Sequence, residues 1–350
     1  MRKLAQNRQI FIRRRRLLYL RRGLLLLACA AILALLIATP IWIVNRVRNH
    51  ADDSRDKTKK PGNSVSDGVD TEEGDNPVVE PGAVVLGSEV HSEYAALWDM
   101  TEGRLVAAKN ANVQANPASI TKVMTLLVAV ENIDNLDAEY TVPWQVTTQV
   151  ALDATRAGLN SGDVFTLRDL LYGCILPSGA DAAVALAHYV TGLSADHIAE
   201  AEARFAEMMN QRAAELGATN THFVNTSGLH HKDHKTTAKD MALIMAAAMK
   251  NETCRQVLMA ERYSSPATQS LPPQQLAAGE WRSTLFTGWL GADHYGIVAG
   301  KTGYTGQASH TLATYTVGAD GHEYVLVTMS AKGSDKAVED ARYLFDTYCR

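Results

Sequence analysis

Short strand-like runs rich in apolar residues lie at the start of the globular part of the chain and again near its end. Residues 93–99 and 104–109 flank the polar turn at 100–103, which predicts a β-hairpin. Residues 296–305, 310–317 and 322–330 predict three consecutive strands, with Gly-Ala-Asp-Gly at 318–321 as a hairpin turn. Because short turns connect these strands, we expect an antiparallel sheet.

Helix-like patterns fill the middle of the chain. Pro117 precedes a run that predicts a helix over 119–130. Thr166 and Asp169 have the spacing of a helix cap before the apolar run that ends at Leu176. Further helices are predicted over 180–190, 195–216, 237–249 and 334–348. Strands at both ends of a helical middle indicate an α/β (α+β) fold, in which helices flank an antiparallel sheet and also form a helical subdomain.

A longer apolar segment precedes the globular part. Residues 23–44 contain no charged side chain, and 22 residues are enough to cross a bilayer as a helix. Residues 45–83 are rich in Asp, Ser, Lys, Gly and Pro, a composition typical of a disordered linker. We therefore predict a basic cytoplasmic tail over 1–22, a transmembrane signal-anchor helix over 23–44, a linker over 45–83 and one catalytic domain over 84–350.

The charge distribution gives this segment an orientation. Residues 1–50 contain 11 Lys and Arg and no Asp or Glu, whereas residues 51–350 contain 23 Lys and Arg against 38 Asp and Glu. Nine of the basic residues precede the apolar segment, so the positive-inside rule predicts a single-pass protein of the cell membrane with the domain outside. A cleaved signal peptide is the alternative, although its apolar region is normally about 7–15 residues long. Beside a membrane segment, topology explains the arginine cluster without a nucleic-acid partner.

Cysteine usage points to neither a metal site nor a disulfide framework. Cys174, Cys254 and Cys349 follow the apolar segment, an odd number without metal-ligand spacing. Cys174 falls in the apolar run 170–176 and is predicted to be a buried free thiol. We expect no metal and no cofactor.

Three short motifs carry the candidate chemistry, namely Ser119-Ile-Thr-Lys122, Ser178-Gly-Ala180 and Lys301-Thr-Gly303. The second serine follows the first by 59 residues, and the late lysine follows after 123 more. A serine followed by a lysine three residues later, a second serine and a late Lys-Thr-Gly are the parts of an acyl-transfer site with lysine as its base. Each motif alone has a simpler structural interpretation, as a helix cap, a loop or a strand end. Their order and wide spacing favour a site.

The first motif has a physical rationale on a helix. Residues three apart share a face, so the Ser119 and Lys122 side chains can touch. Lysine acts as a base only if burial or a nearby cation lowers its pKa. The neighbours of Lys122 are apolar, and Lys301 is a candidate for the nearby positive charge.

These motifs resemble those of the serine D-alanyl-D-alanine carboxypeptidases, the low-molecular-mass penicillin-binding proteins. The resemblance covers about residues 84–335 and includes three further matches, at 117–125, at 225–229 with 234–240, and at 301–305. It implies a β-lactamase/transpeptidase-like fold. It also implies a hydrolase that trims the terminal D-alanine from peptidoglycan stem peptides during cell-wall biogenesis, with β-lactam antibiotics as acylating inhibitors.

The resemblance assigns roles to individual residues. Ser119 would be the acylated nucleophile and Lys122 its base, and Ser178 would relay a proton to the leaving amine. The backbone N–H groups of Ser119 and Tyr304 would form the oxyanion hole.

The late motif would bind the substrate. Lys301 and Thr302 would hold the terminal carboxylate of the D-Ala-D-Ala peptide by charge and hydrogen bond. Gly303 would let the peptide backbone lie along the strand.

One position departs from the family pattern. The family's second motif is Ser-x-Asn, and this chain has Ala180 in place of the asparagine, whose amide normally bridges the active-site lysine and the substrate. Losing a positioned hydrogen-bond donor costs about 10²–10³ in rate in acyl transfer. Slow turnover is therefore expected unless another group fills the gap, and Asp181 is not an obvious replacement.

Two other functions compete with the carboxypeptidase. A catalytically weak penicillin-binding-like protein with a binding or regulatory role is suggested by Ala180. A β-lactamase-like hydrolase is the other, although the chain has no Glu-x-x-Leu-Asn run of the kind that deacylates class A β-lactamases. The chain ends soon after the predicted closing helix, so we expect no additional C-terminal β-rich domain.

Overall fold

The structure is a computed structural model, and it describes residues 81–271 and 279–350. The predicted tail and anchor helix lie outside the described residues, as does most of the predicted linker. Among the helices of the described part, none combines the length and apolar character that a membrane span requires.

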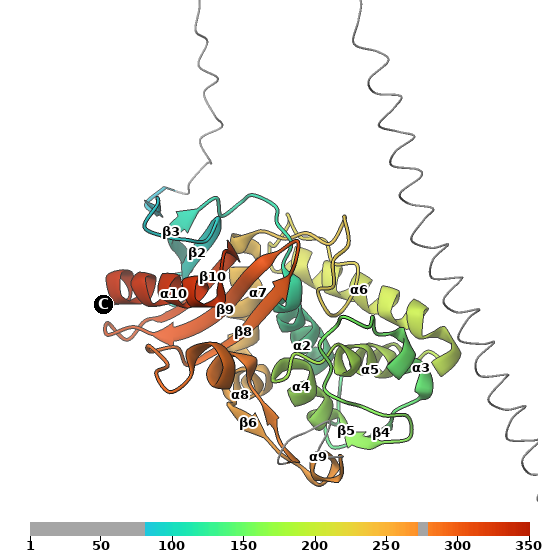
Figure 1. The fold of residues 1–350 in the computed structure, drawn as a ribbon. Coiled ribbons are helices and arrows are strands. Elements are labelled where there is room, and N and C mark those ends of the chain that lie inside the picture. Colours follow the sequence, from blue (N-terminus) through green and yellow to red (C-terminus); the bar gives the residue numbers. More distant parts are fainter. Residues whose placement is uncertain (1–80, 272–278) are drawn as a thin grey trace, which may run out of the picture. The chain divides into compact units, whose positions relative to one another are not determined.

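The centre of the fold is a six-stranded sheet in the order β1-β3-β2-β10-β9-β8. The predicted N-terminal hairpin and the three predicted C-terminal strands all belong to it. Its strands are β1 (Val84–Val85), β2 (Tyr94–Asp99), β3 (Arg104–Lys109), β8 (Ala299–Thr305), β9 (Ser309–Val317) and β10 (Glu323–Ala331). The two ends of the described chain therefore meet in one sheet, because β2 pairs with β10 (Figure 1).

The prediction of an antiparallel sheet is correct for five strands and wrong for one. The pairs β3–β2, β2–β10, β10–β9 and β9–β8 are antiparallel, whereas β1 runs parallel to β3. The sheet is therefore mixed. Strand β1 is two residues long, too short for an alternating pattern that would reveal it in the sequence.

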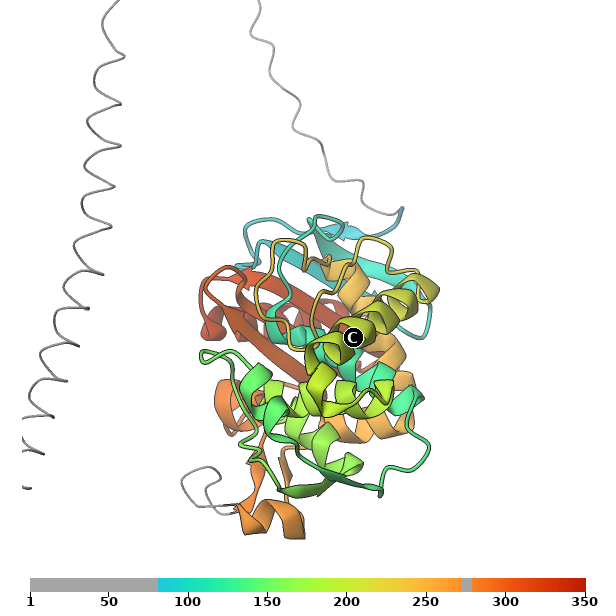
Figure 2. The same ribbon diagram turned by 90° about the vertical axis from the view of Figure 1, so that its right-hand side faces the viewer.

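Side chains of the central strands alternate between two buried faces. On β2, Ala96 belongs to one hydrophobic cluster and Leu97 to the other; on β10, Val325 and Leu326 divide in the same way. Helices α7 (Ala238–Lys250) and α8 (Glu252–Met259) cover the first face. Helix α10 (Ser334–Tyr348) and the π-helical η4 (Thr284–Leu290) cover the second. The result is a helix–sheet–helix sandwich, visible from two directions (Figures 1 and 2).

A group of helices lies beside the β8 edge of the sheet and forms the predicted helical subdomain (Figure 1). It consists of η1 (Ala118–Thr121), α2 (Lys122–Glu131), α3 (Trp144–Gln149), α4 (Leu167–Ile175), α5 (Ala180–Thr191), η2 (Ala195–His197) and α6 (Ile198–Glu215). The segment η1–α2 lies between the two parts, since η1 contacts β8 and β9 while α2 packs on α4, α5, α6 and α7. The predicted helix over 119–130 is thus present, but its first turn is a 3₁₀ turn.

Short elements that the sequence pattern did not reveal complete the described part. They are the pair β4 (Glu139–Thr141) and β5 (Val164–Thr166), the pair β6 (Arg262–Tyr263) and β7 (Trp281–Arg282), and helix α9 (Pro266–Ser270). Local capping was more predictable. Thr166 and Asp169 form the expected capping box at the start of α4, and Thr237 caps α7.

Candidate active site

The nucleophile candidate is held in a strained turn. Ala118, directly before Ser119, has φ +50°, a left-handed conformation that non-glycine residues rarely adopt. Gly228 lies against this turn, because a Cβ added to it would be 1.9 Å from the Ala118 carbonyl oxygen. The loop around Gly228 and the η1 turn therefore pack backbone against backbone directly before Ser119.

The predicted contact between Ser119 and Lys122 is present. Lys122 Nζ donates to Ser119 Oγ at 3.1 Å and to the Ser227 carbonyl oxygen at 2.7 Å. The lysine is 2% exposed. Burial lowers the pKa of Lys122 to about 8, although Cys174, Asp181 and Glu202 oppose this shift. A substantial neutral fraction is thus available near pH 8 to accept the serine proton.

Lys301 is the second buried lysine of the site, with 1% of its surface exposed. Its pKa is also lowered, first by burial and then by the positive charge of Lys122. Of the two causes that the sequence predicts for the lowered pKa of Lys122, burial among apolar neighbours is the dominant one. Repulsion between the two ammonium groups contributes to the lowered pKa of Lys301. Because two buried ammonium groups repel, the pair favours fewer than two protons.

Strand β8 brings the rest of the third motif to the serine. A Cβ added to Gly303 would lie 2.8 Å from the Ser119 nitrogen, so only glycine lets the strand approach this closely. Lys301 Nζ donates to the Thr302 carbonyl oxygen at 2.8 Å, and the Thr302 and Thr284 hydroxyls lie 2.7 Å apart. The Thr311 hydroxyl on the neighbouring β9 donates to the Pro117 carbonyl at 2.8 Å, which ties the sheet to the turn before the serine.

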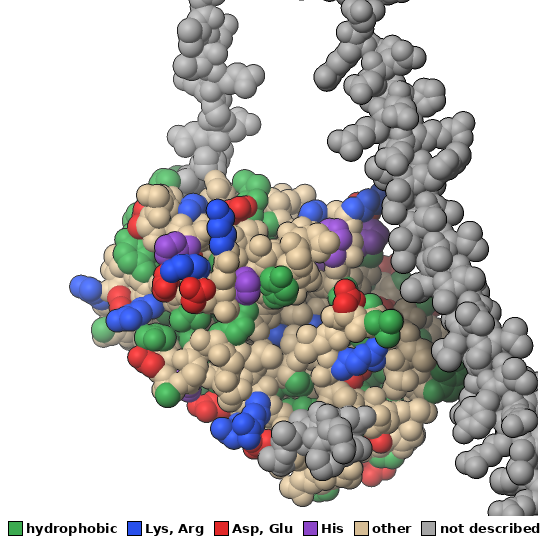
Figure 3. Space-filling view, in the orientation of Figure 1, with side chains coloured by type: hydrophobic (Ala, Val, Ile, Leu, Met, Phe, Trp, Pro, Cys, Tyr) green, Lys and Arg blue, Asp and Glu red, His purple; other side chains and the backbone are tan. Residues whose placement is uncertain are grey.

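A cavity of about 270 Å³ opens over this arrangement. Four segments line it: Ser119 and Lys122; 153–155 with Ala180; 227–230; and Tyr304 to Gln307. Tyr304, assigned to the oxyanion hole through its backbone, keeps 61% of its surface exposed at the rim. The space-filling view shows Lys or Arg atoms recessed among uncharged ones near the middle of this face (Figure 3).

Only part of the second motif, Ser178-Gly-Ala180, lines the cavity. Ser178 is buried, with φ +63°, in the connection from α4 to α5, and its hydroxyl makes no hydrogen bond to other described residues. Ala180 lines the cavity where the family pattern has an amide. The relay role of Ser178 therefore stays a prediction.

Asp181 does not replace the missing amide. Its carboxylate is fully buried and accepts hydrogen bonds from the backbone N–H groups of Ala157, Gly158, Leu159 and Ala182, at 2.7 to 3.0 Å. This carboxylate ties the loop over residues 150–159 to α5, and its hydrogen bonds go to backbone N–H groups rather than to Ser119 or Lys122.

Two residues near the base have roles that sequence reasoning missed. Ser227 acts through its backbone carbonyl, which accepts from Lys122. His234 is 1% exposed: Val224 N–H donates to its Nδ1 at 3.0 Å, which places the proton on Nε2, 2.9 Å from the Thr121 hydroxyl. Burial and then neighbouring histidines lower the pKa of His234 to about 3, so the ring is neutral. The only signal in the sequence was the match at 225–229 and 234–240.

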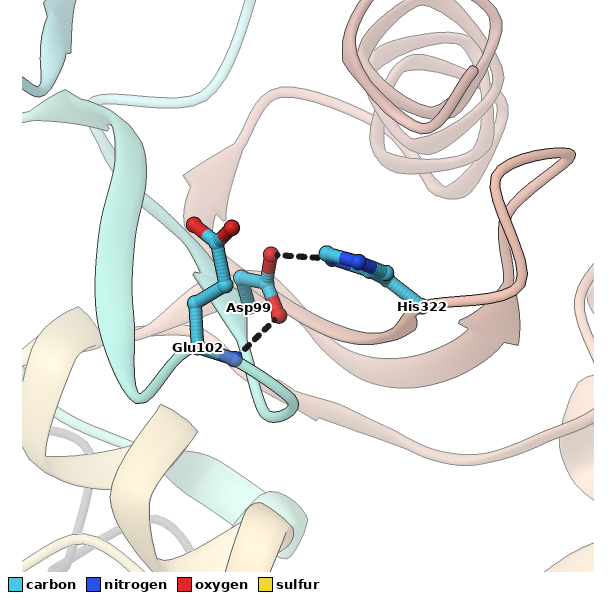
Figure 4. A group of neighbouring side chains, drawn as sticks. All are labelled: Asp99, Glu102 and His322. Atoms are coloured by element: carbon cyan, nitrogen blue, oxygen red, sulfur yellow. Dashed lines mark hydrogen bonds and ion pairs between the residues drawn. The ribbon is translucent and has the colours of Figure 1, made fainter.

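One group of side chains in the described part has donor atoms close enough for a metal: Asp99, Glu102 and His322 (Figure 4). The Asp99 carboxylate already accepts from the backbone N–H groups of Thr101 and Glu102, and His322 Nδ1 lies 2.9 Å from its other oxygen. The hydrogen bond to Asp99 raises the pKa of His322. This group joins the β2–β3 and β9–β10 turns, and nothing in it calls for an ion.

The cysteines of the described part are buried free thiols, Cys174 included, as predicted for it. Burial raises the pKa of Cys174 to about 11, so its thiol stays neutral.

Comparison with known proteins identifies this arrangement. The profile of the family described as D-alanyl-D-alanine carboxypeptidase matches residues 80–333, well over half of the chain. The chain belongs to the D-alanyl-D-alanine carboxypeptidase family.

Individual relatives agree with this assignment. The chain is 31% identical over 264 residues to D-alanyl-D-alanine carboxypeptidase DacD of Escherichia coli, covering 73% of this chain and 62% of the relative. It is 32% identical over 235 residues to DacB2 of Mycobacterium tuberculosis, covering 67% and 73%. The match to DacF of Bacillus subtilis is 29% over 222 residues, covering 63% of this chain and 53% of that protein. The chain thus spans between about half and three quarters of these relatives.

Solved structures of the family share the fold. The Streptomyces K15 DD-transpeptidase superposes with a TM-score of 0.64 at 28% identity, covering 73% of this chain and 98% of that one. A D-alanyl-D-alanine carboxypeptidase from Mycobacterium tuberculosis H37Rv gives 0.62 at 28% identity, covering 76% and 93%. The expected DD-peptidase-like architecture is confirmed, apart from the mixed sheet.

Proposed function

We propose that this member of the D-alanyl-D-alanine carboxypeptidase family is a membrane-anchored serine DD-carboxypeptidase. It removes the terminal D-alanine from peptidoglycan stem pentapeptides through an acyl-serine intermediate. The observation that carries the proposal is the buried Lys122 amine, 3.1 Å from the Ser119 hydroxyl and with its pKa lowered to about 8. A serine hydroxyl is a weak nucleophile, and an adjacent base of this kind activates it.

In the acylation step, Ser119 Oγ attacks the carbonyl carbon of the penultimate D-alanine while Lys122 takes the hydroxyl proton. The N–H groups of Ser119 and Tyr304 stabilise the oxyanion that forms, the largest electrostatic contribution expected in acyl transfer. The C–N bond then breaks, the leaving D-alanine amine takes a proton through Ser178, and the acyl group remains on Ser119. Water, activated by Lys122, completes hydrolysis.

The two buried lysines suit this sequence of steps. A substrate carboxylate near Lys301 and Thr302 stabilises a proton on Lys301. Because the two ammonium groups repel, that proton disfavours a second one on Lys122, which stays neutral and able to act as base. Substrate binding would thus help to prepare the base.

The membrane part of the proposal rests on the sequence alone. The uncharged segment 23–44 and the nine basic residues before it support a single-pass anchor, a cytoplasmic N-terminus and an extracytoplasmic domain. A domain outside the membrane would meet both peptidoglycan and β-lactam antibiotics.

Labelling with a fluorescent penicillin, followed by measurement of D-alanine release from a diacyl-D-Ala-D-Ala peptide, tests the proposal. We expect labelling of the native protein, none of Ser119→Ala, and release of D-alanine with little penicillin hydrolysis. Labelling without peptide turnover would instead favour the weak penicillin-binding role that Ala180 suggests. Rapid penicillin hydrolysis would favour a β-lactamase.

A further inference from the structure

The loop over residues 225–229 supplies two contacts at the nucleophile and its base. The Ser227 carbonyl accepts from Lys122 Nζ at 2.7 Å. Gly228, with φ +83°, lies against the Ala118 carbonyl in the turn before the serine. Both contacts therefore depend on how accurately this loop is held.

Backbone hydrogen bonds do not hold the second half of this loop. Among the described residues, positions 227–229 make no hydrogen bond to another backbone group. The preceding residue, Thr226, has partners outside the loop: its carbonyl accepts from the Thr125 hydroxyl at 2.6 Å, and its N–H donates to Glu202 at 3.3 Å. These contacts fix the residue before the carbonyl that meets the lysine, but not that carbonyl itself.

The side chain of Asn225 holds the remaining residues. Its Oδ1 accepts from the N–H groups of Ser227 and Gly228 at 3.2 and 2.8 Å, and its Nδ2 donates to the Leu229 carbonyl at 2.9 Å. An amide suits this position because it combines an acceptor and a donor at its end. The short asparagine side chain reaches its own backbone two and three residues further on, as in an Asx turn.

We propose that Asn225 is a positioning residue for the base Lys122. Its amide holds the Ser227 carbonyl against the lysine, and it holds Gly228 against the turn before the nucleophile. This inference rests on the proposed function and adds a residue to it. Asn225 acts through the loop backbone and does not touch the reacting atoms, so its loss would leave the base present but misplaced.

Removal of the amide gives the first test. Residues 226–228 are buried, so in Asn225→Ala the freed N–H groups have to move to find new partners. A displacement of about 1 Å at a reacting group can cost about 10²-fold in rate, and we expect penicillin acylation of Ser119 to slow by about that factor. Labelling rates with a fluorescent penicillin measure this.

Asn210→Ala is the matched control. Asn210 on α6 also holds backbone groups through its amide, since it accepts from the Phe223 N–H at 2.7 Å and donates to the Phe223 carbonyl at 2.9 Å. These contacts lie before the loop. We expect both variants to lower the thermal unfolding midpoint, and only Asn225→Ala to slow acylation. Native acylation in Asn225→Ala, or equal slowing in the two variants, overturns the proposal.

Asn225→Asp tests the same role with a smaller change. A carboxylate still accepts from the two N–H groups but cannot donate to the Leu229 carbonyl. Loss of one hydrogen bond is worth about tenfold, so acylation at high pH should stay within about tenfold of the native rate. The carboxylate also adds a negative charge to the loop that contacts Lys122. Because this charge favours the ammonium form, the pH midpoint of acylation should rise by about one pH unit.

A titration of Lys122 separates this inference from the proposed function. In Ser119→Ala protein with carbon-13 lysine, the Cε signal of Lys122 follows the charge of its amine, and Lys122→Met assigns that signal. We expect Asn225→Asp to raise the pKa of Lys122 from about 8 by about one pH unit. An unchanged titration overturns the role of Asn225. If penicillin fails to label the native protein, the proposed function is contradicted, and a raised pKa still supports Asn225.

Discussion

The two sides of the cavity differ in how closely the backbone segments around them pack. On the Ser119 side, backbone meets backbone: Gly228 lies against Ala118, and Gly303 against the Ser119 nitrogen, so closely that a single added methyl would collide. On the opposite side, Ala180 presents only a methyl group to the cavity. Asp181, next in the chain, accepts hydrogen bonds from the N–H groups of residues 157–159 and of Ala182.

This difference separates two requirements of acyl transfer. In the proposed mechanism the nucleophile and its base need fixed geometry, and the close backbone packing on the Ser119 side supplies it. On the other side, Ala180 cannot make the hydrogen bond that the asparagine of the family pattern makes. The loop there is nevertheless held in place by its hydrogen bonds to Asp181. The wall therefore presents a methyl group to the cavity in place of the amide of the family pattern. We predict that this change affects turnover more than it affects the Ser119–Lys122 contact.

The largest expected effect comes from removing the base. Lys122→Met keeps the length and apolar stem of the side chain but cannot accept the serine proton. General-base catalysis is typically worth about 10²–10⁴, and we expect penicillin acylation to slow by about 10³-fold. Stopped-flow or gel-based labelling rates check this, with Lys332→Met at an exposed lysine as control. Acylation within tenfold of the native rate would remove Lys122 from its assigned role.

A substitution at Gly228 should disrupt the close backbone packing on the Ser119 side of the cavity. Its φ is +83°, and an alanine there would place Cβ 1.9 Å from the Ala118 oxygen. Strain and overpacking together should lower the free energy of unfolding by about 3–5 kcal/mol. Gly192 is the matched control, with φ +64° but nothing within 4 Å of an added Cβ, so Gly192→Ala should cost about 1–2 kcal/mol. Urea unfolding measures both, and equal losses would contradict the close fit.

The pH dependence of acylation reports the base directly. With the pKa of Lys122 at about 8, the neutral amine decreases about tenfold per pH unit below pH 8 and approaches its full amount above it. Acylation rates measured from pH 6 to 9.5 should rise and then level off. Because the folded-state pKa lies below the ordinary value, the unfolded chain binds more protons between about pH 8 and 10.5. This lysine therefore makes the folded state more stable as pH rises through that window. A rate independent of pH would contradict the assignment.

The smallest effect is expected on the open side. Ala180→Asn restores an amide to a position that lines the cavity, and we predict that it does not lower peptide turnover. Steady-state D-alanine release compares it with the native protein, and penicillin labelling confirms that Ser119 remains reactive. A clear loss of turnover would show that alanine is an adapted part of the site.

Much of this structure follows from local patterns. The closing helix begins and ends where the sequence predicts, at Ser334 and Tyr348, and the Ser119–Lys122 contact follows from their spacing. The parallel pairing of β1 is non-local and leaves no periodicity in two residues. The role of the Ser227 carbonyl could not be predicted from the sequence for another reason. Every residue has a backbone carbonyl, and only the fold decides which one accepts from Lys122.

The turn before the serine carries a consequence for how the protein matures. Residues 118, 228 and 303 come from segments separated by 110 and 75 positions, and they are in place around the serine only when the last of them has joined the sheet. A chain that still lacks β8 therefore cannot place Gly303 against the Ser119 nitrogen. If the proposed activity is correct, a covalent β-lactam would label complete molecules and leave truncated ones unlabelled.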